Sequence, residues 1–172
     1  NKSWFKLYDK GVPSSIYYPP VTAKLMFNEH AEKNPDRDYL VINDMHFSYK
    51  LVNMMARKTA NSLISLGVKK GDRVAIMSPN LPQYCIAFQA CAKLGAIVVP
   101  VNPLAAMPEV RHYIKDSGAE TIIVMAVFSK GAIEILKAKD TPLKNVITFQ
   151  IQAMPVEVEK GPGIYDFNEL SA

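Results

Sequence analysis

Cysteine, tryptophan and long runs of like charge are all scarce in this sequence. Its 172 residues include two cysteines and one tryptophan, and 20 basic and 16 acidic residues leave a net charge of +4 at pH 7. Two cysteines are too few for the disulfide framework of a small secreted domain, so we expect a reducing, cytoplasmic location. Because the basic residues are interspersed with acidic ones, they predict a solvated surface and argue against a nucleic-acid partner.

The two cysteines predict neither a disulfide nor a metal site. Cys85 and Cys91 are six positions apart on one predicted helix. At about 1.5 Å of rise per residue their Cα atoms would be roughly 9 Å apart, beyond the ~7 Å limit for a disulfide. Neither cysteine has zinc-ligand spacing with a histidine, so we interpret both as small buried hydrophobic residues.

A long uninterrupted apolar segment is also missing. The stretch 74–92 carries no charge, but serine, asparagine and two prolines interrupt it at 78–82. That pattern predicts a strand, a loop and a helix instead of a membrane span. The opening stretch 4–18 mixes aromatic and charged residues with proline, which is not the pattern of a signal peptide. We therefore expect no transmembrane segment.

Motifs that bind nucleotide phosphates are absent as well. The sequence holds no Walker A pattern and no glycine triple of the dinucleotide-binding type. The three histidines, His30, His46 and His112, lie far apart in the chain on separate predicted elements. We expect exposed or locally bonded imidazoles there, and we assign no catalytic, cofactor-binding or metal-binding residue in this chain.

Three polar segments are candidates for a site, and local structure explains each of them. Asp36-Arg37-Asp38 is typical of a charged turn before a strand, and Lys69-Lys70 of a solvated turn. Asn102 follows a predicted parallel strand, at the position where α/β sheets bind ligands. Asparagine beside proline is common turn chemistry, so a loop-fixing role is favoured for Asn102 over ligand binding.

Strands alternate with helices along most of the chain. The apolar patterns predict strands near 39–43, 73–77, 97–101, 121–125 and 145–149. They predict helices over 21–32, 48–66, 82–94, 108–115 and 129–137. This alternation indicates an α/β fold, with a mainly parallel sheet flanked by helices through right-handed βαβ crossovers. Residues 46–48 could also return after the first strand as the second arm of a hairpin.

The same patterns predict a division of the chain into three segments and the burial of one helix and one strand. We expect an N-terminal arm at 1–20, an α/β subdomain at 21–152 and a linker at 153–172. The helix at 82–94 is apolar nearly all round, which predicts deep burial that encloses Phe88. The strand at 97–101 is β-branched without alternation, which predicts burial on both faces.

Several motifs occur in an order that resembles a known family. They are Phe47-Ser48-Tyr49, Gly71-Asp72-Arg73-Val74, Lys93-Leu94-Gly95-Ala96, Pro100-Val101-Asn102-Pro103 and Asp116-Ser117-Gly118-Ala119. In this order they resemble the N-terminal region of the adenylate-forming acyl-CoA synthetases, the AMP-binding, luciferase-like superfamily. The opening resembles that of long-chain fatty acyl-CoA ligases in particular, through Trp4-Phe5, Tyr8-Asp9 and Gly11-Val12-Pro13.

The resemblance implies an enzyme that uses ATP, CoA and Mg²⁺ to convert a fatty acid into acyl-CoA through an acyl-adenylate. The family's Ser/Thr/Gly-rich phosphate loop, its adenine-binding segment, its magnesium-binding acid and its C-terminal lysine have no counterpart here. Asp166–Leu170 resembles the family segment that precedes the phosphate loop. We therefore expect an N-terminal fragment that is inactive alone and binds none of these cofactors tightly.

Two family features are missing, and two other readings stay open. Leu51 stands where the family usually has a glutamate, and Ala106 where a threonine commonly caps a helix, a loss of about 1 kcal/mol per missing cap. The family also includes short-chain, aryl and peptide-synthetase members, and a non-catalytic α/β binding or assembly module would share the same pattern.

The aromatic arm and an apolar face predict self-association, with a homodimer expected.

Overall fold

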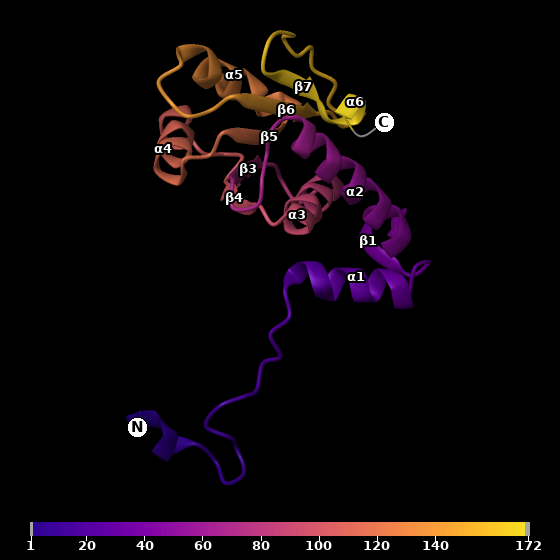
Figure 1. Ribbon diagram of the computed structural model, residues 1–172, viewed down its shortest axis with the longest axis vertical. Helices are drawn as coiled ribbons and strands as arrows, with labels where there is room; N and C mark the ends of the chain where they lie inside the picture. Colours follow the sequence, from indigo (N-terminus) through magenta and orange to yellow (C-terminus); the bar gives the residue numbers. More distant parts are fainter. Residues whose placement is uncertain (1, 171–172) are drawn as a thin grey trace.

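A five-stranded parallel sheet forms the centre of the computed structural model, which describes residues 2–170 (Figure 1). The strands are β3 (Arg73–Met77), β4 (Ile97–Val101), β5 (Thr121–Met125), β6 (Asn145–Phe149) and β7 (Ile164–Asp166). Their order in the sheet is β4-β3-β5-β6-β7, and every neighbouring pair is parallel. The predicted α/β fold with a mainly parallel sheet is confirmed, and four of the five expected strands lie at the expected positions.

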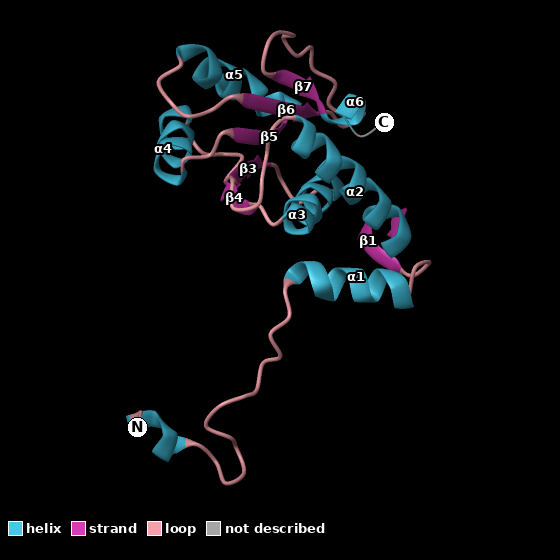
Figure 2. Ribbon diagram, in the orientation of Figure 1, coloured by secondary structure: helices cyan, strands magenta, loops and turns pink. Residues whose placement is uncertain are grey.

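Helices cover both faces of this sheet (Figure 2). The longer helices are α1 (Ala23–Lys33), α2 (Tyr49–Ser65), α3 (Pro82–Leu94), α4 (Met107–Ser117) and α5 (Ser129–Ala138). The short ones are α6 (Phe167–Leu170) and the 3-10 turns at Ser3–Leu7 and Ala126–Phe128. Within residues 2–170, none of the helices has the length and apolar composition that crossing a membrane requires.

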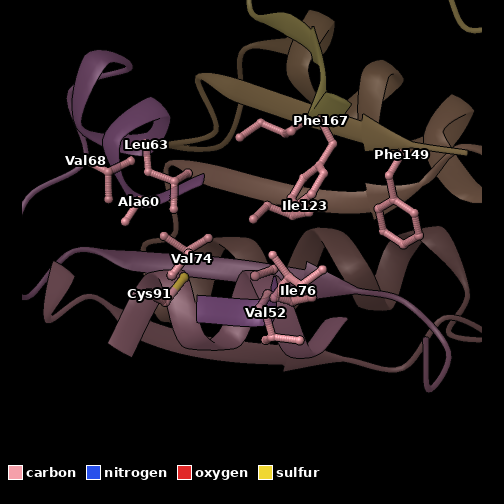
Figure 3. Close-up of a cluster of buried hydrophobic side chains, with 14 of the residues drawn as sticks. Val52, Ala60, Leu63, Val68, Val74, Ile76, Cys91, Ile123, Phe149 and Phe167 are labelled. Carbon is pink, nitrogen blue, oxygen red and sulfur yellow. The ribbon is translucent and has the colours of Figure 1, made fainter. Parts of the chain in front are cut away.

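Alternate side chains of the central strands enter two separate cores. Val74 and Ile76 of β3 pack with α2 and α3, whereas Ala75 and Met77 of the same strand pack with α4 and α5. All four side chains are fully enclosed. Because successive side chains of a strand point to opposite faces, one apolar strand can close two cores. Figure 3 shows the first core, in which Val52 and Ile76 lie together.

The ends of the helices follow the expected local chemistry. The Ser48 hydroxyl accepts a hydrogen bond from the Leu51 N–H at 3.2 Å and caps α2. Gly95 and Gly118 end α3 and α4 with φ of +83° and +66°, a conformation that glycine adopts without strain. Ala106 at the start of α4 provides no side-chain cap, as the missing threonine predicts.

The first predicted strand lies outside the parallel sheet, so its placement there was wrong. It forms β1 (Asp38–Ile42), which pairs antiparallel with β2 (Met45–Ser48) in a separate two-stranded sheet. The reason is the two-residue turn at Asn43-Asp44, in which Asn43 has φ of +51°. Such a short connection joins only antiparallel strands. The hairpin alternative is therefore the observed one.

The segment 153–172, expected to be a linker, contributes the fifth strand of the sheet. Its described part contains β7 and α6, and β7 pairs with β6. Gly163 precedes β7 with φ of +79°, and a Cβ there would lie 2.5 Å from the Lys144 carbonyl oxygen. A glycine at this position therefore lets the two backbones approach closely, so that the chain can return to the sheet as β7. Residues 2–20, by contrast, extend away from the rest of the chain (Figure 1).

The expected burial of the 82–101 region was only partly correct. Ile86, Ala87, Ala90 and Cys91 of α3 are buried, but Phe88 is only half-buried and belongs to neither core. Strand β4 is an edge strand that pairs only with β3, and Ile97 is 53% exposed. The lack of alternation in its β-branched run therefore does not reflect burial on both faces within residues 2–170.

Ile86 and Phe88 of α3 differ in burial, so replacing each by alanine should lower the stability of the fold by different amounts. Ile86→Ala should lower the free energy of unfolding by about 2–5 kcal/mol, because it opens a cavity in an enclosed core. Phe88→Ala should cost less, although it removes a larger side chain, because Phe88 is half-buried. Urea denaturation of the two variants measures this. An equal or greater loss for Phe88→Ala would place that ring in the core and contradict the structure.

Candidate functional site

The carboxyl edge of the sheet is the first place to look for a site. All five strands run in the same direction, so the loops that follow them meet at one edge. These loops are 78–81, 102–106, 126–128 and 150–163. In open α/β sheets, ligands bind in the crevice outside this edge.

A hollow of about 870 Å³ lies beside β6 and β7 at this edge. Acidic side chains dominate its polar lining, which includes Glu157, Asp166 and Glu169. One Asp166 oxygen accepts hydrogen bonds from the Asn168 and Glu169 N–H groups at 2.7 and 3.3 Å, and so caps α6. The Gln150 side-chain oxygen accepts from the Val156 N–H at 3.2 Å. These polar groups hold local backbone, and none forms a nucleophile–base pair in the described residues.

Asn102 fixes the turn after β4. Its side-chain oxygen accepts a hydrogen bond from the Leu104 N–H at 3.0 Å, and its backbone carbonyl accepts from the Ala105 N–H at 3.0 Å. An asparagine that bonds the backbone two residues on forms an Asx turn. The geometry therefore agrees with the loop-fixing role. Leu104 at the tip of this loop is 84% exposed.

The three histidines stay on separate elements. His46 Nδ1 lies 2.7 Å from Asp38 Oδ2 across the β1–β2 hairpin, and both side chains are about half exposed. The rings of His30 and His112 lie beside Tyr49 and Tyr113, with centroids 6.1 and 6.2 Å apart. Within residues 2–170, no three His, Cys, Asp or Glu side chains are arranged to hold a metal ion. Asp38 thus belongs to a local pair, while Lys69-Lys70 stays an exposed turn.

The cysteine thiols are not activated as nucleophiles. Burial raises the pKa of Cys91 to about 12, and burial also raises the pKa of Cys85. Both are free, as expected from their spacing. Because the thiolate is the reactive form, these groups stay protonated and inert at neutral pH.

One buried polar contact was not foreseen. Gln89 lies on the inner side of α3, where its amide donates to the Tyr39 hydroxyl at 2.9 Å and ties the helix to the β1–β2 hairpin. Gln89 stands among apolar residues, and that isolated polarity was the only signal in the sequence. Burial raises the pKa of Tyr39, and the Gln89 hydrogen bond acts in the opposite direction.

Comparison with known proteins identifies the family. Residues 27–165 match the family model described as AMP-binding enzyme. The chain belongs to this family. The match spans β3, β4, β5 and β6 of the sheet, the first two residues of β7 and both strands of the hairpin. It confirms the resemblance to the adenylate-forming synthetases drawn from the ordered motifs.

Curated members of the AMP-binding family share substantial identity with the chain. A long-chain-fatty-acid–CoA ligase of Salmonella typhimurium is 36% identical over 148 residues, which cover 85% of this chain and 26% of that protein. The long-chain-fatty-acid–CoA ligase FadD13 of Mycobacterium tuberculosis is 39% identical over 99 residues, covering 58% of this chain and 20% of the relative. The matched region is thus about a quarter of the length of such relatives.

Solved structures of other proteins share the fold. The anthranilate CoA ligase AuaEII, in complex with anthranoyl-AMP, superposes with a TM-score of 0.76 at 22% identity, covering 88% of this chain and 28% of that one. The N-terminal domain of FACL13 from Mycobacterium tuberculosis gives a TM-score of 0.66 at 35% identity, covering 73% of this chain and 33% of that one.

The Asx turn at Asn102 yields a test that separates a loop role from a ligand role. Asn102→Ala should lower stability by about 0.5–1.5 kcal/mol, the usual net value of one hydrogen bond. Asn102→Asp should retain most of that stability, because a carboxylate oxygen can accept the same bond from the Leu104 N–H. Thermal unfolding of both variants measures the difference. Equal losses for both would mean that the amide nitrogen carries the role, and would contradict loop fixing.

Proposed function

We propose that the protein containing this chain is a long-chain fatty acid–CoA ligase, and that the chain forms its N-terminal α/β unit. The supporting observation is the 36% identity to the Salmonella ligase across 85% of the chain. In the proposed reaction, a fatty acid and ATP form an acyl-adenylate and pyrophosphate. CoA then takes the acyl group and releases AMP, and Mg²⁺ accompanies the ATP.

The contribution of this chain to that reaction is structural. Its strands and helices form the two cores, and its polar groups at the carboxyl edge cap helices and fix turns. No catalytic, cofactor-binding or metal-binding residue is assigned in it. We propose that the catalytic groups lie in the remaining parts of the enzyme and that the chain alone is inactive.

A second acid substrate class has its own supporting observation. A crotonobetaine/carnitine–CoA ligase of Salmonella paratyphi A is 30% identical over 152 residues, covering 86% of this chain. This relative favours a ligase for a short polar acid. The higher identity to the long-chain ligases makes a fatty acid the preferred substrate.

We also propose a cytoplasmic location, which the two free thiols support. A homodimer is the proposed assembly. Its support is the exposed aromatic and aliphatic surface of the arm, where Trp4, Tyr17 and Tyr18 are 51%, 83% and 77% exposed. The exposed edge strand β4 adds Ile97, which is 53% exposed. Exposed apolar surface of this kind drives association.

The ligase proposal predicts the behaviour of two samples. The complete protein should release pyrophosphate with ATP and Mg²⁺ when oleate is present, and faster than with carnitine or benzoate at equal concentration. The 172-residue chain should release none above a buffer blank, because its sequence has no loop to hold the transferring phosphorus. A coupled pyrophosphate assay measures both. Release by the chain alone, or a complete protein that prefers carnitine, would overturn the corresponding part of the proposal.

The assembly proposal predicts concentration-dependent association that the arm causes. Light scattering of the chain at increasing concentration should show a dimer, and a variant beginning at Val21 should shift toward monomer. Lys10→Gln, which changes the arm's charge and leaves its aromatic residues, is the matched control and should behave like the original chain. A monomer at every concentration would refute the dimer. Association unchanged by trimming would instead exclude the arm as its cause.

A further inference from the structure

A groove with a volume of about 360 Å³ lies between α1 and α2, at the end of α3. Lys24, Asn28 and Glu32 line it from α1, and Asn53, Arg57 and Asn61 from α2. Within each set the residues are four positions apart, which places them along one face of their helix. The lining is completed by Lys93 and Leu94 at the end of α3 and by Ala60 and Ile64 of α2. The groove is separate from the carboxyl edge of the sheet, since Lys93 precedes β4.

The positive groups of this groove form no ion pair among the described residues. Lys24, Arg57 and Lys93 face it, with Glu32 as the only acidic lining residue. Within residues 2–170, none of the three cations lies within 4.0 Å of a carboxylate oxygen. Elsewhere in the chain, Arg111 and Lys115 both pair with the carboxylate of Asp140. The groove therefore holds several positive charges that a bound anion would neutralise.

Neutral contacts hold two of the cations in place. The Lys24 ammonium donates to the Lys93 carbonyl oxygen at 3.0 Å. The Lys93 ammonium donates to the Asn28 side-chain oxygen and lies 5.1 Å from the centroid of the Phe27 ring. Burial lowers the pKa of Lys93, and the neighbouring charges of Arg57 and Lys24 lower it further. The three cationic side chains are thus held close together although their charges repel one another. A bound anion would reduce that repulsion.

The Asn53 side chain lines the same groove, and its oxygen is buried and unpaired within residues 2–170. The Asn53 side-chain oxygen is buried and has no hydrogen-bond partner within the described residues. Buried polar atoms are normally paired, and an unpaired one requires an explanation. A ligand with both an anionic group and a hydroxyl would satisfy the cations and, once the Asn53 side chain turns toward the groove, this acceptor as well.

We propose that the groove between α1 and α2 binds a phosphate monoester, with Arg57, Lys93 and Lys24 on the phosphate oxygens and Asn53 accepting from a hydroxyl of the same ligand. Arg57 suits this role because its planar guanidinium can donate two parallel hydrogen bonds to one phosphate. The groove is concave and lined by amides as well as cations, which fits a compact polar group. The proposal is independent of the ligase activity, since no reacting group is involved.

Binding of glycerol 3-phosphate to the full chain tests the site. In ¹⁵N-labelled protein, backbone signals of α1, α2 and the end of α3 should shift in a saturable manner. Arg57→Gln and Lys93→Gln should each weaken binding at least tenfold. Lys69→Gln removes one charge from an exposed turn outside the groove and should leave binding unchanged. Circular dichroism of each variant tests whether the fold is retained. Asn53→Ala is a second variant of the groove that changes no charge, and it should weaken binding threefold or more.

Three control measurements decide the outcome. Glycerol should cause no shifts, and sodium chloride at matched ionic strength should cause none that saturate. Vesicles of phosphatidylcholine with phosphatidic acid distinguish the source of the phosphate. Arg57-dependent binding to glycerol 3-phosphate assigns a soluble ligand, and Arg57-dependent binding to these vesicles alone assigns a lipid headgroup. Shifts reproduced by sodium chloride, or a loss with Lys69→Gln equal to that with Arg57→Gln, would overturn the proposal.

Discussion

Strand β3 hydrogen-bonds to a strand on each side and sends alternate side chains into two cores, and the remaining architecture depends on that double use. Val74 and Ile76 complete the core under α2 and α3, while Ala75 and Met77 complete the one under α4 and α5. An element buried on both faces cannot contain a polar side chain without a partner, which explains the purely apolar run from Val74 to Met77. The helices can then take their places only on opposite sides of the sheet.

Because the strands are parallel, the loops that follow them lie at one edge of the sheet, apart from the groove between α1 and α2. Each crossover returns the chain to the amino end of the next strand, so all strand-to-helix loops gather at the carboxyl edge. There the polar side chains mainly hold backbone, as Asn102 and Asp166 do. Lys24, Arg57 and Lys93 lie elsewhere, in the groove between α1 and α2. The chain therefore offers an ordered scaffold at the edge where open α/β sheets bind ligands, and a separate charged groove on the helical side.

Local patterns predicted the elements well, because their determinants are close in sequence. The β-branched run of β5 and the glycines after α3 and α4 each identify one element without tertiary information. The Asn102 turn was predictable for the same reason, since an asparagine and its bonded backbone are two residues apart. Membership of the family was predictable because several ordered motifs coincide in one short chain.

Properties set by distant residues were not predictable. Strand β7 is three residues long, and only its pairing with β6 makes it a strand. The edge position of β4 depends on the strand order, so its apolar run gave no sign of exposure. A helix that is apolar all round has no sequence signal for its inner face, and Phe88 was misplaced for this reason. The Gln89–Tyr39 bond and the convergence of Lys24, Arg57 and Lys93 likewise exist only after helices pack.

Amide hydrogen exchange of the 172-residue chain, read by peptide-level mass spectrometry, tests the central role of β3 most directly. The slowest exchange should occur in β3 and β5, which are buried on both faces and paired on both sides. Strands β4 and β7 at the edges should exchange faster, and residues 2–20 fastest of all. Exchange of β3 as rapid as that of β4 would contradict the claim that β3 organises both cores.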